Sequence, residues 1–148
     1  HILKTKSAYN IELIEIDKDV IDVSKKYFNH YFKYVNDNNV NIIIEDGVKW
    51  IKKRKGSKYD AIIIDSTDPN KISKMLFTKS FYRLVYNNLK SKGIFIQQSG
   101  SPVLHGKKII YPTIKKLNEI KFTNITCHNL SMPLYPLGVW SFIKCVKA

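Results

Sequence analysis

Apolar and polar positions follow two different periods along the chain. Short runs that are almost wholly apolar or rich in β-branched residues predict strands at residues 11–16, 40–44, 61–64, 93–97, 124–130 and 139–146. Between them, apolar side chains return every three or four residues and predict helices at 18–28, 48–53, 76–89 and 107–119. The chain therefore alternates strands with helices and ends on two strands.

Three of the predicted helices carry a more specific expectation. The first places Val20, Val23 and Tyr27 on one face, and the third is expected to bury Phe77, Phe81, Leu84 and Val85. Pro112 lies inside the last helix, and proline is tolerated best in the first turn of a helix. We therefore expect a helix boundary or a kink near Pro112.

The alternation predicts an α/β fold, a mostly parallel sheet with helices on both faces. In such sheets, ligands bind beyond the carboxyl ends of the strands. The polar residues at four of these ends are Glu15 and Asp17, Asp46 and Gly47, Asp65 and Asp68, and Gln97 and Gln98. Asp17 and Asp46 could each be a helix N-cap. Three acidic strand ends on one rim nevertheless predict a ligand that is rich in hydroxyl or amine groups, and cationic.

The stretch Asp65-Ser66-Thr67-Asp68-Pro69 directly follows one apolar strand. Two carboxylates three residues apart in a tight turn can point into one cleft, where they repel each other unless a cation lies between them. An ammonium substrate would relieve that repulsion. The alternative is an Asx-turn with a solvated second aspartate, and these five residues alone leave both interpretations open.

Composition narrows the class of protein. With 148 residues and 44% hydrophobic side chains, the chain suits one domain and is too apolar for intrinsic disorder. The formal net charge is +13, yet residues 1–68 hold 12 basic and 11 acidic side chains, whereas residues 69–148 hold 13 basic ones and a single acid, Glu119. Because 23 of the 25 basic residues are lysine, which AT-rich codons alone can enrich, we expect neither a nucleic-acid partner nor a membrane.

The cysteines and histidines show no metal or redox motif. Cys127 and Cys145 lie in apolar segments without CxxC spacing, so we expect buried free thiols in a reducing, cytoplasmic compartment. His1, His30, His105 and His128 are scattered and form no HxxxH or HExxH pattern, and each is expected at the surface or in packing. We expect no metal cofactor.

Five motifs, in order and with matching spacing, carry a resemblance to a known family. EID at 15–17, EDG at 45–47 and YDAIIIDSTDP at 59–69 resemble the spermidine synthase family of aminopropyltransferases. QSGSP at 98–102 and MPLYPLGVWSF at 132–142 look like later motifs of that family. The resemblance runs from about residue 2 to residue 145 and implies a Rossmann-like, class I methyltransferase-like sheet.

The resemblance also implies a reaction, the transfer of an aminopropyl group from decarboxylated S-adenosylmethionine to a diamine, usually putrescine. It assigns Glu15 to the ribose hydroxyls of that co-substrate, and Asp46 with Gly47 to its adenine. No metal takes part, and members of the family are typically homodimers or homotetramers.

On the amine side, the resemblance implies that Asp65 is the proton acceptor. Asp68 is its partner in holding the amine, and Tyr135 lines the amine channel. General chemistry supports these roles, because an ammonium has no lone pair until a nearby base takes its proton. The sulfonium leaving group is already activated, so in-line positioning is the remaining requirement.

Relative to the family, residues 1–148 correspond to a partial catalytic domain. The N-terminal β-domain, the first strand and the Gly-rich nucleotide loop have no counterpart in this sequence. Loss of that strand would leave two strands without a neighbour. We therefore expect the 148 residues by themselves to be poorly stable and inactive.

Two local departures bear on the amine site. Asn70-Lys71-Ile72-Ser73-Lys74 replaces a Gly-Pro stretch in the gating loop, so its lysines either point outward or the activity has drifted. Leu134 and Leu137 replace common Thr and Ser, which puts acceptor length in doubt. The open alternatives are a spermine or thermospermine synthase, an ordinary methyltransferase, a non-catalytic homologue, and a basic nucleic-acid-binding module. Lysines lining the cleft around Asp65 would contradict an amine substrate.

Overall fold

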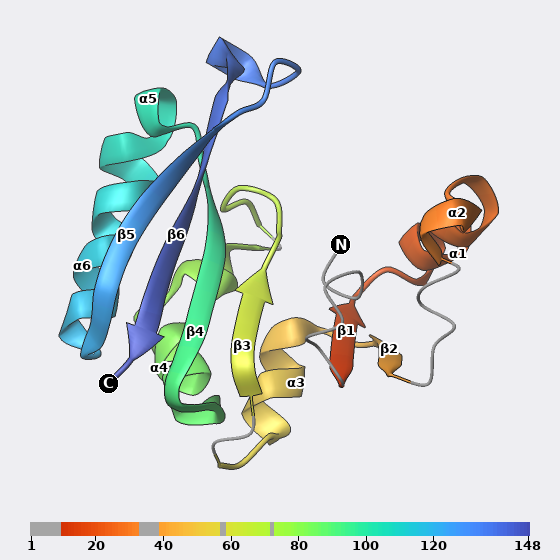
Figure 1. Ribbon diagram of the computed structural model, residues 1–148, viewed down its shortest axis with the longest axis horizontal. Helices are drawn as coiled ribbons and strands as arrows, with labels where there is room; N and C mark the ends of the chain where they lie inside the picture. Colours follow the sequence, from red (N-terminus) through yellow and green to blue (C-terminus); the bar gives the residue numbers. More distant parts are fainter. Residues whose placement is uncertain (1–9, 33–38, 57–58, 72) are drawn as a thin grey trace. The chain divides into compact units, whose positions relative to one another are not determined.

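The computed structural model describes residues 10–32, 39–56, 59–71 and 73–148. Contacts along the chain group it into two compact units, His1–Lys53 and Arg54–Ala148. Each unit has its own sheet, and each is described by itself (Figure 1).

The first unit contains two parallel strands and three helices. The strands are β1 (Ile11–Glu15) and β2 (Val40–Ile44), with Glu15 opposite Ile44. The helices are α1 (Lys18–Tyr27), α2 (Asn29–Phe32) and α3 (Gly47–Lys53). The predictions at 11–16, 18–28, 40–44 and 48–53 are thus confirmed to within one residue at each end, whereas α2 had no sequence prediction.

Capping explains where α1 and α3 begin. The Asp17 carboxylate accepts a hydrogen bond from the Asp19 backbone N–H over 2.9 Å. Asp46 Oδ1 accepts from the N–H groups of Val48 and Lys49, over 2.8 and 2.9 Å. Both aspartates are therefore helix caps, because each satisfies N–H groups that have no partner within the helix.

The apolar face predicted for α1 is not buried within this unit. Val20, Val23 and Tyr27 are exposed, and Ile21 is the buried side chain of the helix. A two-stranded sheet offers a narrow surface, so only part of a ten-residue helix can pack on it.

The second unit contains a four-stranded sheet in the order β3-β4-β6-β5 (Figure 1). Its strands are β3 (Tyr59–Ile64), β4 (Leu89–Gly100), β5 (Phe122–Ser131) and β6 (Val139–Lys147). β3 and β4 are parallel, whereas β6 is antiparallel to both β4 and β5. The α/β class is confirmed, and the short β5–β6 connection accounts for the antiparallel pairs, since parallel neighbours need a longer crossover.

The helical segments of the second unit are more divided than the sequence predicted. They are η2 (Ser73–Phe77, 3-10), α4 (Lys79–Asn88), α5 (Pro102–His105), η3 (Gly106–Ile110, π-helical), α6 (Tyr111–Glu119) and η4 (Pro136–Gly138, 3-10). The helix predicted at 76–89 begins at Lys79, because the Thr78 hydroxyl accepts from the Phe81 N–H. Pro112 lies in the first turn of α6, directly after the π-helical turn, as its chemistry favours.

The core of the second unit lies between the sheet and one layer of helices. α4 and α6 contact each other, and each packs on the sheet (Figure 1). Phe77, Phe81 and Val85 are buried as predicted, whereas Leu84 is half-buried. Tyr82 is fully buried against the ring of Phe95, and this burial raises the pKa of the Tyr82 hydroxyl well above its usual range.

The prediction of two buried thiols is half wrong. Cys145 on β6 is fully buried, and its burial raises the pKa of the thiol to about 12. Cys127 is exposed because it lies on β5, the outer strand of the sheet order. Within the described ranges, no helix combines the length and the apolar character that crossing a bilayer requires.

Candidate active site

Asp65 and Asp68 border a pocket of about 600 Å³ in the second unit. Asp65 directly follows β3, and Gln98 lies one residue beyond the β4 position that pairs with Ile64. The pocket is lined by Asp65, Ser66, Thr67, Asp68, Gln98, Leu130, Met132, Tyr135, Pro136, Trp140 and Phe142. The sequence placed Asp65, Asp68 and Tyr135 at one amine site, and they share this pocket.

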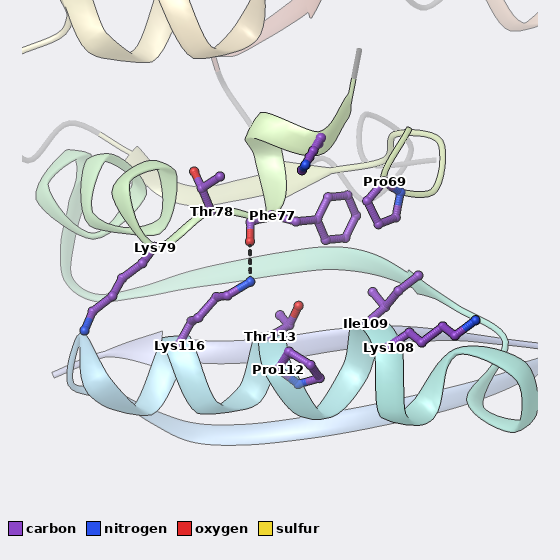
Figure 2. A pocket seen from close by; sticks show the side chains of 10 residues that line it. Pro69, Phe77, Thr78, Lys79, Lys108, Ile109, Pro112, Thr113 and Lys116 are labelled. Carbon is purple, nitrogen blue, oxygen red and sulfur yellow. Dashed lines mark hydrogen bonds between the residues drawn. The ribbon is translucent and has the colours of Figure 1, made fainter. Parts of the chain in front are cut away.

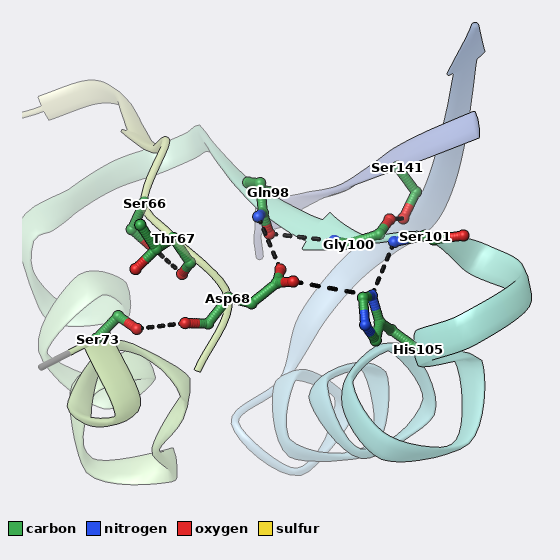
Figure 3. Close-up of polar contacts among 9 residues, drawn as sticks. All are labelled: Ser66, Thr67, Asp68, Ser73, Gln98, Gly100, Ser101, His105 and Ser141. Carbon is green, nitrogen blue, oxygen red and sulfur yellow. Dashed lines mark hydrogen bonds and ion pairs between the residues drawn. The ribbon is translucent and has the colours of Figure 1, made fainter. Parts of the chain in front are cut away.

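The two carboxylates have different surroundings. Among the described residues, no hydrogen bond or ion pair reaches the exposed carboxylate of Asp65. Asp68 is half-buried, and its Oδ1 accepts a hydrogen bond from Gln98 Nε2 over 3.0 Å (Figure 3). Asp68 is thus an anchored carboxylate, which differs from the solvated second aspartate of an isolated Asx-turn.

Hydrogen bonds within the loop after Asp68 fix its backbone. Ser73 Oγ donates to the Asp68 carbonyl over 2.6 Å, and it accepts from the Asn70 N–H over 3.0 Å. Asn70 Oδ1 in turn accepts from the Ser73 N–H over 3.1 Å. Although this stretch departs from the family pattern, its own side chains hold the turn that carries Asp68.

The lysines of this loop do not line the pocket beside Asp65. Lys71 is exposed, and Lys74 lines a separate pocket of about 400 Å³ together with Lys79, Lys108 and Lys116 (Figure 2). In that second pocket, Lys116 Nζ donates to the Phe77 carbonyl over 2.8 Å. Neither of these two loop lysines therefore lines the pocket beside Asp65, which fits the outward orientation. Among the residues that the structure describes, those lining the pocket around Asp65 and Asp68 include two carboxylates and no lysine.

Aromatic side chains also line the acidic pocket, the one that Asp65 and Asp68 border. The rings of Tyr135 and Trp140 meet edge to face, with centroids 4.6 Å apart. Leu134 and Leu137 are exposed and do not line the pocket. Their replacement of Thr and Ser therefore changes the outer surface of this turn and leaves the pocket wall unaltered.

Glu15, Asp46 and Gly47 lie in the first unit. Glu15 is the last residue of β1, and Asp46 lies two residues beyond β2. Because β1 and β2 are parallel, both strands end at the same edge of the two-stranded sheet. Glu15 Oε1 accepts from the Asp17 N–H over 2.9 Å. Asp46 Oδ1 caps α3, and Gly47 is the first residue of that helix. The predicted nucleotide residues and the predicted amine residues thus belong to different units of the chain.

His105 is the polar neighbour of the site that the sequence missed. Its Nδ1 lies 4.0 Å from Asp68 Oδ2, and its ring meets Trp140 edge to face at 6.0 Å (Figure 3). No metal-binding spacing marks this histidine. The signal was its position four residues after Ser101, which places it one helical turn beyond the end of β4.

The chain matches a known family along its whole length. The family profile described as "Spermine/spermidine synthase domain" matches residues 1–148. The polyamine aminopropyltransferase of Methanocaldococcus jannaschii is 38% identical over 146 residues, which cover 99% of this chain and 49% of that protein. The polyamine aminopropyltransferase of Thermoplasma volcanium is 37% identical over 131 residues, which cover 87% and 46%. The chain spans about half the length of the curated relatives it matches.

Two solved structures agree with this match. A spermidine synthase in complex with the transition state analogue AdoDATO superposes with a TM-score of 0.89 at 30% identity, covering 99% of this chain and 50% of that one. The spermidine synthase of Thermotoga maritima superposes with a TM-score of 0.85 at 30% identity, covering 99% and 48%. The motifs, the fold and these matches lead to one conclusion: the chain belongs to the spermine/spermidine synthase family.

Proposed function

We propose that the protein transfers the aminopropyl group of decarboxylated S-adenosylmethionine to putrescine, giving spermidine and 5′-methylthioadenosine. The observation that carries this proposal is a pocket to which the described residues contribute two carboxylates and no lysine, in a unit of the chain that is otherwise strongly basic. A cationic diamine gains from carboxylates at this position and would be repelled by lysines. The family relationship supports the same reaction.

In the proposed mechanism, Asp68 holds the amine and Asp65 takes its proton. Asp65 suits a base because its carboxylate has no hydrogen-bond partner among the described residues. Once the ammonium has given a proton to Asp65, its nitrogen lone pair attacks the aminopropyl carbon bound to sulfur. The new C–N bond forms as the C–S bond breaks, and the electron pair stays on sulfur to leave a neutral thioether.

The aromatic side chains of the pocket would hold the carbon chain of the amine. Tyr135 and Trp140 line the same pocket as the two carboxylates, with their rings edge to face. Alkyl groups pack on such surface, and an ammonium close to a ring face is attracted by its quadrupole. This arrangement fits a linear amine with one charged end at Asp65 and Asp68.

For the co-substrate, we propose that Glu15 accepts hydrogen bonds from the ribose hydroxyls, while Asp46 and Gly47 contact the adenine. Asp46 keeps one oxygen for this purpose, because its helix cap uses Oδ1, and Oδ2 has no bond within the described part of the chain. No metal cofactor enters the proposed reaction. A spermine or thermospermine synthase would use the same groups with a longer acceptor.

The test is an assay of the full-length protein that measures 5′-methylthioadenosine from decarboxylated S-adenosylmethionine. Putrescine, spermidine and cadaverine are supplied separately as acceptors. Asp65→Asn is expected to lower kcat by roughly 100-fold or more, since it removes the base. Asp60→Asn is the matched control, because Asp60 lies on β3, the strand that Asp65 follows, and pairs with Lys90 at the surface.

Turnover with putrescine at least about ten times more efficient than with spermidine supports a spermidine synthase. The reverse preference would assign a spermine or thermospermine synthase instead. A full-length protein that transfers no aminopropyl group to any of these amines would contradict the proposal and indicate a non-catalytic homologue. A protein active only with S-adenosylmethionine as a methyl donor would be a methyltransferase.

We also propose that the full-length protein is a homodimer or homotetramer in the cytoplasm. Family resemblance supports the oligomer, and free cysteines support a reducing compartment. Light scattering of the purified protein checks the oligomer, and fractionation of cells checks the compartment. A monomer, or an exported protein with oxidised cysteines, would contradict these two expectations.

A further inference from the structure

His105 is held in one orientation by the turn from which it arises. Its backbone N–H donates to the Ser101 carbonyl over 2.8 Å, and its Nδ1 accepts from the Ser101 backbone N–H over 3.0 Å. An imidazole nitrogen that accepts a hydrogen bond carries no proton, so the proton of the neutral ring lies on Nε2. Figure 3 shows the ring fixed between Ser101 and the carboxylate of Asp68.

This orientation determines whether the imidazole can donate a hydrogen bond to Asp68 Oδ2. Nδ1 and Oδ2 are 4.0 Å apart, and neither atom supplies a proton when the imidazole is neutral. This distance is also beyond that of a hydrogen bond. Within the described part of the chain, Asp68 Oδ2 therefore has a neighbour but no hydrogen-bond donor.

The other carboxylate oxygen is fixed from the opposite side. Gln98 Nε2 donates to Oδ1, and Gln98 Oε1 accepts from the Gly100 N–H over 3.1 Å, so the amide of Gln98 cannot turn without losing a bond. Ser141 Oγ donates to the Gly100 carbonyl over 2.8 Å. The Asp68 carboxylate is thus held by a hydrogen bond at Oδ1, and the neighbouring imidazole restricts its movement at Oδ2.

Gly100 allows the imidazole to lie this close. A Cβ at that position would lie 2.4 Å from His105 Nδ1 and 3.3 Å from Asp68 Oδ1. The φ angle of Gly100 is +76°, in the region that favours glycine. Any side chain here would displace the ring or the carboxylate.

We propose that His105 is a positioning residue for amine binding, and that its neutral imidazole keeps Asp68 Oδ2 oriented and free for the ammonium of the amine substrate. This inference rests on the proposed function, because it takes the amine as the ligand of Asp68. The groups that face the ring are Asp68 from the loop after β3, Ser101 from its own turn and Trp140 from β6. Asp68 is the one charged group among them.

The proposed role requires the neutral form of the imidazole. A proton on Nδ1 would break the bond from the Ser101 N–H and place a cation 4.0 Å from Asp68 Oδ2. That cation would compete with the ammonium of the substrate for the same oxygen.

The test compares His105→Leu and His105→Asn in the full-length protein with putrescine as the amine. His105→Leu keeps bulk but removes the acceptor, and is expected to raise the putrescine KM about ten-fold, with kcat within about three-fold of wild type. Asn has an acceptor oxygen near the place of Nδ1, so His105→Asn is expected to restore most of the affinity that His105→Leu loses. His128→Leu, at an exposed histidine of β5, is the matched control.

Either of two outcomes would overturn the proposal: a putrescine KM unchanged in His105→Leu, or a putrescine KM raised as much in His105→Asn as in His105→Leu. Nitrogen NMR of the imidazole tests the geometry independently of turnover, and a proton on Nδ1 at pH 8 would also refute it. If the wild-type protein transfers no aminopropyl group, the proposed function fails. Calorimetric putrescine affinity of the same variants then still decides the role of His105.

Discussion

Gln98 Nε2 donates a hydrogen bond to Asp68 Oδ1 over 3.0 Å and so ties the end of β4 to the loop that follows β3 (Figure 3). The two residues are 30 positions apart in the sequence. The parallel register of β3 and β4 brings them together, because Ile64 pairs with Gln97. One amide thereby links the anchored carboxylate of the acidic pocket to the buried centre of the sheet.

Gln98→Leu is expected to weaken the amine site and the fold together. It leaves Asp68 Oδ1 and the Gly100 N–H without partners, so the free energy of unfolding should fall by about 1–3 kcal/mol. The putrescine KM should rise about ten-fold. Urea unfolding and steady-state kinetics measure the two effects, with Asn87→Leu at an exposed position of α4 as the control. Equal stability of the two variants would show that the bond contributes nothing.

Trp140 should report amine binding by fluorescence. It lines the acidic pocket, whereas the other tryptophan, Trp50, lies on α3 in the first unit. In a Trp50→Phe background, putrescine is expected to shift the Trp140 emission to shorter wavelength, because the amine displaces water from the indole. Butane-1,4-diol, which carries no charge, is the matched ligand control. An emission spectrum that does not respond to saturating putrescine would place the amine elsewhere.

The two cysteines should differ in reactivity towards a thiol reagent. Cys127 is exposed, whereas Cys145 is buried and its pKa is raised to about 12, so its thiolate is scarce at pH 8. One thiol per chain is therefore expected to react with dithionitrobenzoate in the native protein, and both in denaturant. Cys127→Ser should abolish the native reaction. Rapid reaction of a second thiol per chain in the native protein would mean that β6 opens readily and exposes Cys145.

The same raised pKa predicts how stability changes with alkaline pH. The folded pKa of Cys145 lies above the reference value of 9.0, so the folded state favours the protonated thiol. Its contribution to stability is complete below pH 9 and is lost as the pH rises towards 12. Urea unfolding at several alkaline pH values should give a shallower decline for Cys145→Ala than for wild type. Identical slopes would contradict the assignment.

Lys116 should stabilise the second unit through its contact with η2. Its ammonium donates to the Phe77 carbonyl at the end of the 3-10 turn, 39 residues away in the sequence (Figure 2). Lys116→Met keeps most of the side-chain bulk but leaves this carbonyl without its donor, so a loss of about 1–2 kcal/mol is expected. Lys115→Met removes a neighbouring exposed charge and is the control. Chemical denaturation measures the free energy of unfolding of both variants. An equal loss of stability in the two variants would show that the contact of Lys116 with the Phe77 carbonyl does not stabilise the unit.

The elements and the acidic residues could be predicted because they depend on local order along the chain. The period of apolar residues located β1, α1, β2 and α3 to within one residue at each end. Asp65 and Asp68 were recognisable because they directly follow an apolar strand. The ends of helices that depend on a single capping residue were harder to predict from the sequence. One hydroxyl, that of Thr78, starts α4 three residues later than the periodicity suggested.

The surroundings of those acids depend on residues that the chain brings together from far apart. Gln98 was recognisable as a strand-end residue, whereas Trp140 and His105 reach the pocket or its carboxylate through the pairing of β3, β4 and β6. The same holds for Cys127, whose exposure follows from the position of β5 at the edge of its sheet. Local periodicity therefore specifies which segments fold and which side chains can do chemistry. Strand order and packing specify which of them meet, because those contacts join residues that are distant in sequence.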